Sequence, residues 1–323
     1  MIVAIDETGQ FRDQTGEEIG IVTLATVTDK EWLKLSSFIN QKIPDGFKGL
    51  KGKNLTDEQR HKVLKYIGSK PEIKYTAYLY DLSGGGDEWV KYHRNETIKR
   101  ANEKIEQMGN LLQPSYVKDI LLYLNQLHNY SIGDYAKFVM FTETITEWQR
   151  FFQFDYVHTH IKNDGWRMHF VIDTQNQPNK FIRLVQSTLI LTTSDLNPNY
   201  GIYTPQEWIQ GHPFIDYHSK DGDPQRQDGR KFFEDFKIGT EQDNPELFLP
   251  DAIGYTILNS ILKRKQKQWL MHLKRLRQNR SWAIINKFKD PDGYYIITGF
   301  DRTKDRKDVM PMVKDHHRLM KLL

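Results

Sequence analysis

The chain has 323 residues, enough for one large domain or two small ones with an apolar core that needs no covalent staple. It contains no cysteine, which excludes disulfides, thiolate zinc sites and a cysteine nucleophile, so a bound metal would need oxygen or imidazole ligands. The net charge of +4 is by itself weak evidence for a polyanionic partner. No apolar run approaches the roughly 20 residues that cross a bilayer, so we expect a cytoplasmic protein with no membrane partner.

The chain opens on a short apolar strand that runs directly into two acids. Four apolar residues, Ile2 to Ile5, precede Asp6 and Glu7. The β-branched stretch 17–27 predicts a second strand, which pairs with the first through the intervening glycine-bounded turn. The sequence therefore begins with a predicted hairpin that carries carboxylates at the end of its first strand.

Two helices and a third strand follow the hairpin. Thr28 or Asp29 can cap the first helix, in which apolar residues recur with a period near 3.6. Thr56 and Gln59 have the spacing of a capping box and predict the start of the second helix. Residues 72–82 then predict a strand.

The middle of the chain is predicted to be a helical insertion over residues 84–165, suited to docking a protein partner. The pattern then returns to a short apolar strand, Phe170 to Ile172, which stops at Asp173. We expect a helix near residues 179–190 and a long surface loop over 211–246, which is rich in Gly, Asp, Pro and Lys.

A late helix carries a third acid and leads into a basic segment. Pro250 suits the first helical position, and Asp251 then lies in the first turn. From residue 252 to 289 there are ten Lys or Arg and no Asp or Glu. A strand is predicted near 293–300.

The basic segment is predicted to contact nucleic acid, because cations bind phosphates and the interleaved Trp269 and Trp282 can stack on bases. A solvated helix face is the alternative. Two lysines of the earlier glycine-rich loop can also contact phosphates, although such lysines are more often simply solvated. The predicted nucleic-acid-binding residues are Lys51, Lys53, Lys263, Arg264, Lys265, Lys267, Lys274, Arg275 and Arg277.

Three distant acids are predicted to share one metal site. If the two strands that run into Asp6 and Asp173 lie side by side, both carboxylates meet at one edge of the sheet. Asp251, on a helix packed against that sheet, can supply the third. About three carboxylates can hold two Mg²⁺ or Mn²⁺ ions roughly 4 Å apart for phosphodiester hydrolysis.

Each acid also has an ordinary structural explanation. An acid after a strand commonly begins a turn, in which its side chain accepts hydrogen bonds from the next backbone amides. An acid in the first turn of a helix is favoured by the helix dipole. Asp301 also follows a strand-like run without any independent sign of catalysis, so the pattern of a strand followed by Asp is weak evidence alone.

Three short motifs together resemble those of a widespread bacterial family with a ribonuclease H-like fold. They are Asp6-Glu7-Thr8-Gly9, Val171-Ile172-Asp173 and Leu249-Pro250-Asp251-Ala252-Ile253. The family has an N-terminal Asp-Glu-Ser-Gly motif, an internal strand ending in Asp and a late Asp on a helix. The resemblance covers most of residues 1–265. It implies that Asp6, Asp173 and Asp251 are catalytic metal ligands, with Glu7 as a fourth ligand or a partner of the ligands.

The chain departs from this family pattern at three positions. Thr8 stands where the family usually has Ser, which keeps the hydroxyl, and Pro250 precedes the late Asp where a small residue is more common. Many members carry a Glu-x-Lys element after the first helix. Here Gly49 stands at the acid position while Lys51 is present, which puts activity in question.

The sequence thus predicts an α/β protein, a ribonuclease H-like mixed sheet flanked by helices, over residues 1–289, with a basic helical stretch at 262–289 and an extension at 290–323. The expected function is a nuclease dependent on Mg²⁺ or Mn²⁺. Resemblance places it in phage defence or a mobile element. The alternatives are an inactive nucleic-acid-binding protein and a scaffold that docks a partner through the insertion. The sequence leaves DNA and RNA, and endo- and exonuclease action, open.

Overall fold

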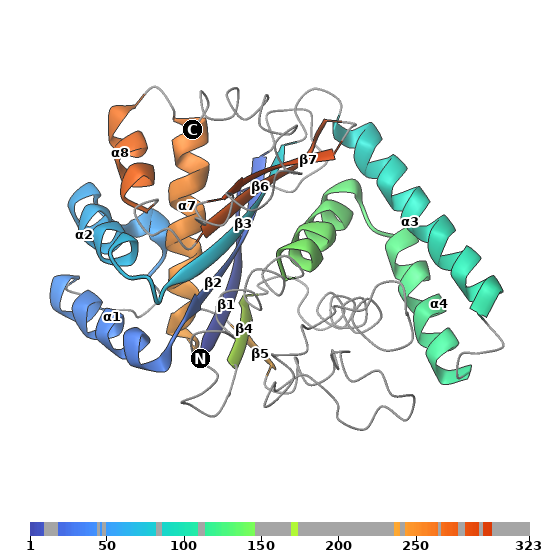
Figure 1. Ribbon diagram of the computed structural model, residues 1–323, viewed down its shortest axis with the longest axis horizontal. Helices are drawn as coiled ribbons and strands as arrows, with labels where there is room; N and C mark the ends of the chain where they lie inside the picture. The colour runs from blue at the N-terminus through green and yellow to red at the C-terminus, as the bar shows by residue number, and fades with distance from the viewer. Residues whose placement is uncertain are drawn as a thin grey trace, which may run out of the picture. The chain divides into compact units, whose positions relative to one another are not determined.

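The fold is seen in a computed structural model of the whole chain (Figure 1). The residues that the structure describes are 1–9, 19–43, 46, 50–81, 86–108, 114–145, 169–173, 236–239, 243–263, 266–276, 282–290 and 293–298. The predicted helix at 179–190, Asp301, the predicted nucleic-acid-binding residues Arg264, Lys265 and Arg277, and Gly49 lie outside these residues.

A seven-stranded mixed sheet organises the chain, with the strand order β5-β4-β1-β2-β3-β6-β7. β1, β2 and β3 are successive antiparallel neighbours, whereas β4 is parallel to β1 and β6 is parallel to β3. β7 returns antiparallel to β6. The mixed α/β class that the sequence predicts is confirmed. The strands are β1 Ile2–Gly9, β2 Ile19–Val27, β3 Lys74–Asp81, β4 His169–Asp173, β5 Phe236–Gly239, β6 Trp282–Asp290 and β7 Gly293–Thr298.

The central strands are buried on both faces. In β1, side chains that point to opposite faces, Val3 and Ala4, are both buried, and in β2 the same holds for Leu24 and Ala25. A strand enclosed on both sides needs a nearly continuous apolar sequence rather than an alternating one. The apolar runs at the starts of β1 and β2 satisfy this need.

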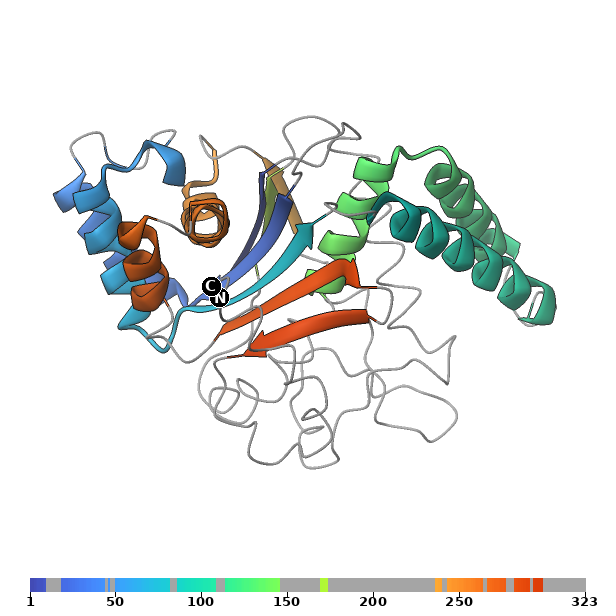
Figure 2. The same ribbon diagram turned by 90° about the horizontal axis from the view of Figure 1, so that it is seen from above.

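In the described part of the sheet unit, four helices lie on one face of the sheet (Figure 2). Thr28 is the N-cap of the first helix and accepts a hydrogen bond from the Glu31 amide. The capping box of Thr56 and Gln59 is present, as the sequence predicts. The elements are α1 Asp29–Lys42, η1 Gly52–Asn54, α2 Asp57–Gly68, η4 Pro245–Leu247, α7 Phe248–Leu262 and α8 Lys267–Leu276.

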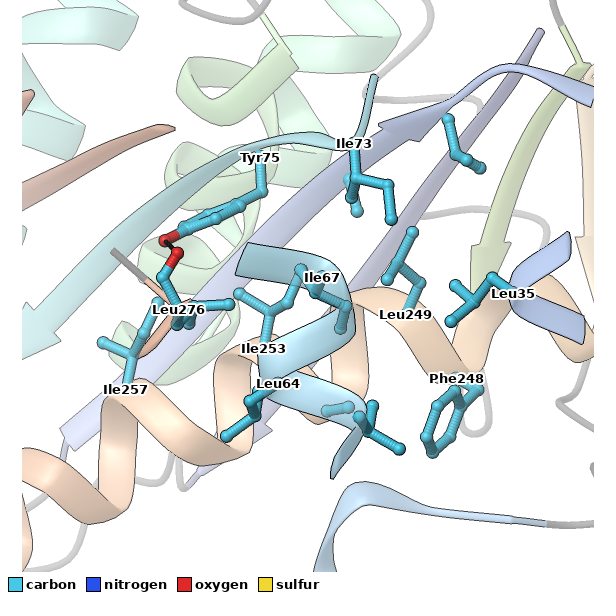
Figure 3. Close-up of a cluster of buried hydrophobic side chains, with 14 of the residues drawn as sticks. Leu35, Leu64, Ile67, Ile73, Tyr75, Phe248, Leu249, Ile253, Ile257 and Leu276 are labelled. Atoms are coloured by element: carbon cyan, nitrogen blue, oxygen red, sulfur yellow. Dashed lines mark hydrogen bonds between the residues drawn. The ribbon is translucent and has the colours of Figure 1, made fainter. Parts of the chain in front are cut away.

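Apolar side chains from these helices and from the sheet form one core cluster (Figure 3). Leu64 of α2 and Ile253 of α7 are fully buried in it. Tyr75 of β3 is also buried, and its hydroxyl donates to the Leu276 carbonyl of α8 at 3.4 Å. Burial of each such side chain stabilises the fold by about 1.5–3 kcal/mol. This cluster holds α7 against the sheet, which matters for the site described below.

The chain divides into two compact units, and the second begins at Asp87 and contains further helices. These are α3 Gly86–Met108, α4 Pro114–His128 and a helix over residues 132–145. Helices are thus present in the described part of the predicted insertion. On α4, Leu124 and Leu127 are buried, whereas Leu121 is exposed. None of the helices in the described residues is long and apolar enough to span a membrane.

Two sequence-based expectations near the end of the sheet unit are wrong. Within the described part of the basic stretch 262–289, helix α8 ends at Leu276, and residues 282–290 form strand β6, which pairs with β3. The expected boundary at residue 289 therefore falls at the end of a strand whose partner, β7, lies beyond it. The β-branched pair Ile284 and Ile285 favours a strand. The prediction of a basic helical stretch follows the positive charges and does not use this signal. The predicted loop 211–246 also contains strand β5.

Candidate functional site

The first two acids lie on neighbouring parallel strands. The register of β1 and β4 pairs Ile5 with Ile172, so Asp6 and Asp173 are the next residues along two adjacent strands. Both carboxylates are buried, with 6% and 5% of their residue surface exposed. The prediction that two strands would bring these acids together is confirmed at the level of the backbone.

The sequence predicts that the first strand ends at Asp6, but the strand continues beyond it. β1 continues to Gly9, because it stays paired with β2 as far as Gly20. The amide of Glu7 donates to the Asp6 Oδ1 atom at 2.8 Å. This contact orients one oxygen of the carboxylate, and it resembles the local hydrogen bond of an ordinary turn-forming acid.

The third acid, Asp251, lies in the first turn of α7 and is 8% exposed. Its Oδ2 atom accepts a hydrogen bond of 2.5 Å from the amide of Gly52 in η1. A Cβ atom at Gly52 would lie 2.8 Å from Ala252 Cα, closer than real Cβ atoms approach backbone. Glycine is therefore required for the loop to reach the helix, and this contact holds the Asp251 carboxylate in place.

Two contacts on either side of Asp251 show where α7 lies on the sheet (Figure 2). Before it, Leu247 packs in a cluster with Ala4 of β1 and Val171 of β4. After it, Gly254 lies against the side chains of Thr8 and Thr23.

These contacts show which of the acids face α7. Asp6 shares a strand face with Ala4, and Asp173 shares one with Val171, because side chains alternate along a strand. Asp251 lies on the helix that covers this same face. Asp6 and Asp173 thus face α7, and the Asp251 carboxylate, in the first turn of that helix, contacts the η1 loop.

The expected metal-ligand set is not assembled in full. Glu7 follows Asp6 directly, so strand alternation directs it to the opposite face of β1, away from α7. Among the described residues, no group of three or more Asp, Glu or His side chains is arranged closely enough to hold a metal ion. The acids share a face, and one oxygen each of Asp6 and Asp251 accepts a backbone amide hydrogen.

Arg60 of α2, which the sequence analysis did not single out, supports the loop that contacts Asp251. Its guanidinium is buried and donates to the carbonyls of Gly52 at 3.0 Å and Leu55 at 2.9 Å. Its other terminal nitrogen donates to Asp57 Oδ1 at 3.2 Å. An arginine within a predicted amphipathic helix ordinarily points to solvent, so only the tertiary structure shows this role.

Aromatic rings enclose the same guanidinium. Its central carbon lies 4.7 Å from the ring centre of Trp269 and 5.3 Å from that of Tyr255, which are distances of cation–π contact. Burial lowers the pKa of Arg60, and burial together with the nearby Arg60 charge lowers the pKa of His272. The group that links α2, α7 and α8 is therefore a buried cation.

The predicted base-stacking role of Trp269 is not supported, because the side chain is only 4% exposed and packs on Arg60 and Tyr255. Its period on α8 directs it to the core. The lysines behave differently: Lys53, Lys263, Lys267 and Lys274 are exposed, whereas Lys51 and Arg275 are half-buried. A phosphate at this surface would therefore contact the exposed lysines, and the buried Trp269 would not stack on a base.

Fold and site together define a mixed α/β protein with two buried aspartates on the sheet face that α7 covers and a third buried in the first turn of α7. Comparison of the chain with protein-family models, curated proteins and solved structures finds no match. The resemblance to the ribonuclease H-like family stays a prediction that depends on the three motifs.

Proposed function

We propose that the protein is a divalent-metal-dependent nuclease of ribonuclease H-like type, with Asp6, Asp173 and Asp251 as its catalytic acids. One observation carries the proposal: Asp6 and Asp173 are buried on adjacent strands on the face of the sheet that α7 covers, and Asp251 is buried in the first turn of α7. Hard divalent cations prefer carboxylate oxygens as ligands. Two aspartates on adjacent strands, with a third acid on the helix that covers them, therefore suit such an ion.

The types of donor fit Mg²⁺ or Mn²⁺, which bind oxygen and accept carboxylates readily. The three aspartates would hold the ion, and the amides of Glu7 and Gly52 orient two of their carboxylates. A bound ion of this kind supplies Lewis-acid stabilisation of charge on phosphate oxygens. The reaction is hydrolysis, in which water adds to phosphorus, the ester P–O bond breaks and the leaving oxygen takes up a proton.

The substrate is proposed to be DNA or RNA, held through its phosphates. Lys51 and Lys53 flank Gly52, so the loop that contacts Asp251 carries two cations. Lys263, Lys267 and Lys274 are exposed at the end of α7 and on α8. Contacts of this kind bind the backbone without reading bases, and their strength falls as salt concentration rises.

A cleavage assay tests the proposal. Labelled single-stranded DNA, double-stranded DNA, RNA and a DNA–RNA hybrid are incubated with the protein in Mg²⁺, in Mn²⁺ and in chelator. Asp173→Asn removes one carboxylate charge with little change of shape. Asp29→Asn is the matched control, because Asp29 is 64% exposed and contacts the N-terminal amine rather than the proposed site.

Cleavage that requires metal, persists in Asp29→Asn and falls by at least about 100-fold in Asp173→Asn would support the nuclease, and the preferred substrate would define its class. Equal nucleic-acid affinity of both proteins without cleavage would favour the binding protein instead. If the protein neither cleaves nor binds nucleic acid, the scaffold is favoured. Deletion of residues 84–165 should then abolish binding of a protein partner.

A further inference from the structure

Two buried threonine hydroxyls lie beside the aspartates on the same face of the sheet. Thr23 of β2 is fully buried, and the hydroxyl oxygen of Thr8 on β1 is also shielded from solvent. Within the part of the chain that the structure describes, neither hydroxyl oxygen has a hydrogen-bond partner. A buried polar group without a partner is rare in native proteins and commonly marks a place for a bound water, ion or ligand.

Other buried threonines in the described residues behave in the ordinary way. Thr256 of α7 donates to the Ala252 carbonyl at 2.8 Å, and Thr144 donates to the Met140 carbonyl at 2.6 Å. A helix offers such a carbonyl four residues back. In the sheet the carbonyls of β1 and β2 are engaged with neighbouring strands, so Thr8 and Thr23 lack this local solution.

Both hydroxyls face Gly254 of α7. The position that a Cβ atom would take at Gly254 is 2.8 Å from Thr23 Oγ1 and 2.9 Å from Thr8 Oγ1. Thr23 is paired directly opposite Asp6 across β1 and β2, and directly opposite residues share a face. Gly254 follows Asp251 by one turn of α7. The hydroxyls therefore lie on the same face as Asp6 and face the helix that carries Asp251.

We propose that the Thr8 and Thr23 hydroxyls belong to the carboxylate site and bind an oxygen ligand beside Asp6. The ligand is either a water of the hydrated cation or an oxygen of the substrate phosphate. A hydroxyl can donate to both, and Gly254 leaves out the Cβ atom that would otherwise crowd both hydroxyls. The inference rests on the proposed metal-dependent function. Thr8 belongs to the first of the three motifs, whereas Thr23 lies outside them.

Thr23→Val in the full chain tests the inference, because valine keeps the shape and removes the hydroxyl. Calorimetry measures Mn²⁺ binding alone, then binding of inorganic phosphate to the Mn²⁺-loaded protein, and thermal unfolding is followed in chelator. Thr23→Ser restores the hydroxyl. Thr256→Val is the control, because its hydroxyl is bonded within α7. Asp173→Asn reports separately on the proposed metal site.

The inference predicts about 10-fold weaker binding of Mn²⁺ in Thr23→Val if the ligand is a water of the cation. If the ligand is a phosphate oxygen, Mn²⁺ binding stays and phosphate binding weakens by a similar factor. In either case Thr23→Ser and Thr256→Val bind as the wild type does, and the unfolding temperature of Thr23→Val in chelator does not fall.

Three results would overturn the inference. In the first, Thr23→Val binds both probes as the wild type does, while Asp173→Asn no longer binds Mn²⁺. The proposed metal site would then be supported, and the hydroxyls would have no part in it. A clear loss of stability of Thr23→Val in chelator would reveal an internal partner for the hydroxyl. Absence of Mn²⁺ binding by the wild-type protein would overturn the proposed function together with this inference.

Discussion

The two ends of α7 lie in different surroundings. At its N-terminal end Phe248 and Leu249 are 1% exposed and Asp251 is buried against the η1 loop. At its C-terminal end Leu262 is 48% exposed and Lys263 is exposed. One helix therefore serves two purposes: its first turns are held by the sheet and place an acid, whereas its last turn presents a cation to solvent.

The helix dipole favours this arrangement at both ends, because it stabilises an anion near the N-terminus and a cation near the C-terminus by about 0.3–1 kcal/mol each. That contribution does not require catalysis. What distinguishes Asp251 from an ordinary first-turn acid is its burial and the hydrogen bond that it accepts from the Gly52 amide of η1. The comparison teaches that charge at a helix end acquires a functional meaning only from what packs around it.

Matched truncations at the two ends give the largest expected difference. Leu249→Ala should lower the free energy of unfolding by about 2–5 kcal/mol, because it empties a position in the core. Leu262→Ala should change it by less than about 0.5 kcal/mol, because the side chain is largely solvated. Urea unfolding followed by circular dichroism measures both. Equal losses would contradict the described packing of α7.

A second substitution addresses the loop at the N-terminal end. Gly52→Ala should lower the free energy of unfolding by about 1–3 kcal/mol, because the new Cβ meets the backbone of Ala252. It should also weaken Mn²⁺ binding, since the amide that orients Asp251 moves with the loop. Lys53→Ala, on the exposed neighbouring residue, is the control for stability. A fully stable Gly52→Ala protein would show that the loop does not approach the helix this closely.

A smaller effect is expected from pH at His272, beside the buried Arg60. Burial first, and then the Arg60 charge, lower the His272 pKa below its ordinary 6.5, against an opposing contribution of Asp57 at 3.8 Å; Arg275 and His61 act in the same direction as Arg60. The unfolded chain therefore binds the proton more tightly. This contribution destabilises the fold progressively as pH falls below about 6.5, by at most about 1.4 kcal/mol per pH unit.

The measurement is the difference in unfolding free energy between the wild type and His272→Phe from pH 7.5 to 5. The wild type should lose stability relative to the variant as pH falls. His61, whose pKa is also lowered, is present in both proteins and cancels from the difference. Parallel pH profiles would show that His272 titrates alike in the folded and unfolded states.

The strands and their acids could be predicted because the signals are local. The apolar runs before Asp6 and Asp173 identify two strands, and Thr56 with Gln59 identifies a helix start. Pairing of β1 with β4 followed from the expectation that both acids serve one site, and the register bears out this part of it.

The remaining features depend on contacts between distant segments. The bond of Gly52 to Asp251 joins residues 199 apart in sequence, and the burial of Arg60 depends on Trp269 and Tyr255 from other helices. No local pattern encodes them. The prediction that Trp269 stacks on bases depends on the charge of the segment, whereas the helical period decides where the side chain lies. The same period that exposes Lys267 and Lys274 of α8 turns the tryptophan inward.

The smallest effect on stability is expected on the exposed face of α8. Lys267→Ala with Lys274→Ala should change the free energy of unfolding by less than about 0.5 kcal/mol, because both side chains are solvated. If these lysines contact phosphates, affinity for nucleic acid should fall alike for all sequences, and the salt dependence should weaken by about one ion per lost contact. Lys30→Ala, exposed on α1, is the control and should leave binding unchanged.

Titration of a labelled single-stranded oligonucleotide at several salt concentrations separates the role of the α8 lysines from that of the buried aspartates. Loss of affinity in the α8 variant, with cleavage retained at saturating substrate, would assign binding to the exposed lysines of α8 and chemistry to the buried aspartates. If the variant and Lys30→Ala bind alike, the lysines of α8 are a solvated face, and phosphates must instead be held by the lysines of the loop beside Asp251. Lys53→Ala would then carry the loss of affinity, because Lys53 is exposed in that loop.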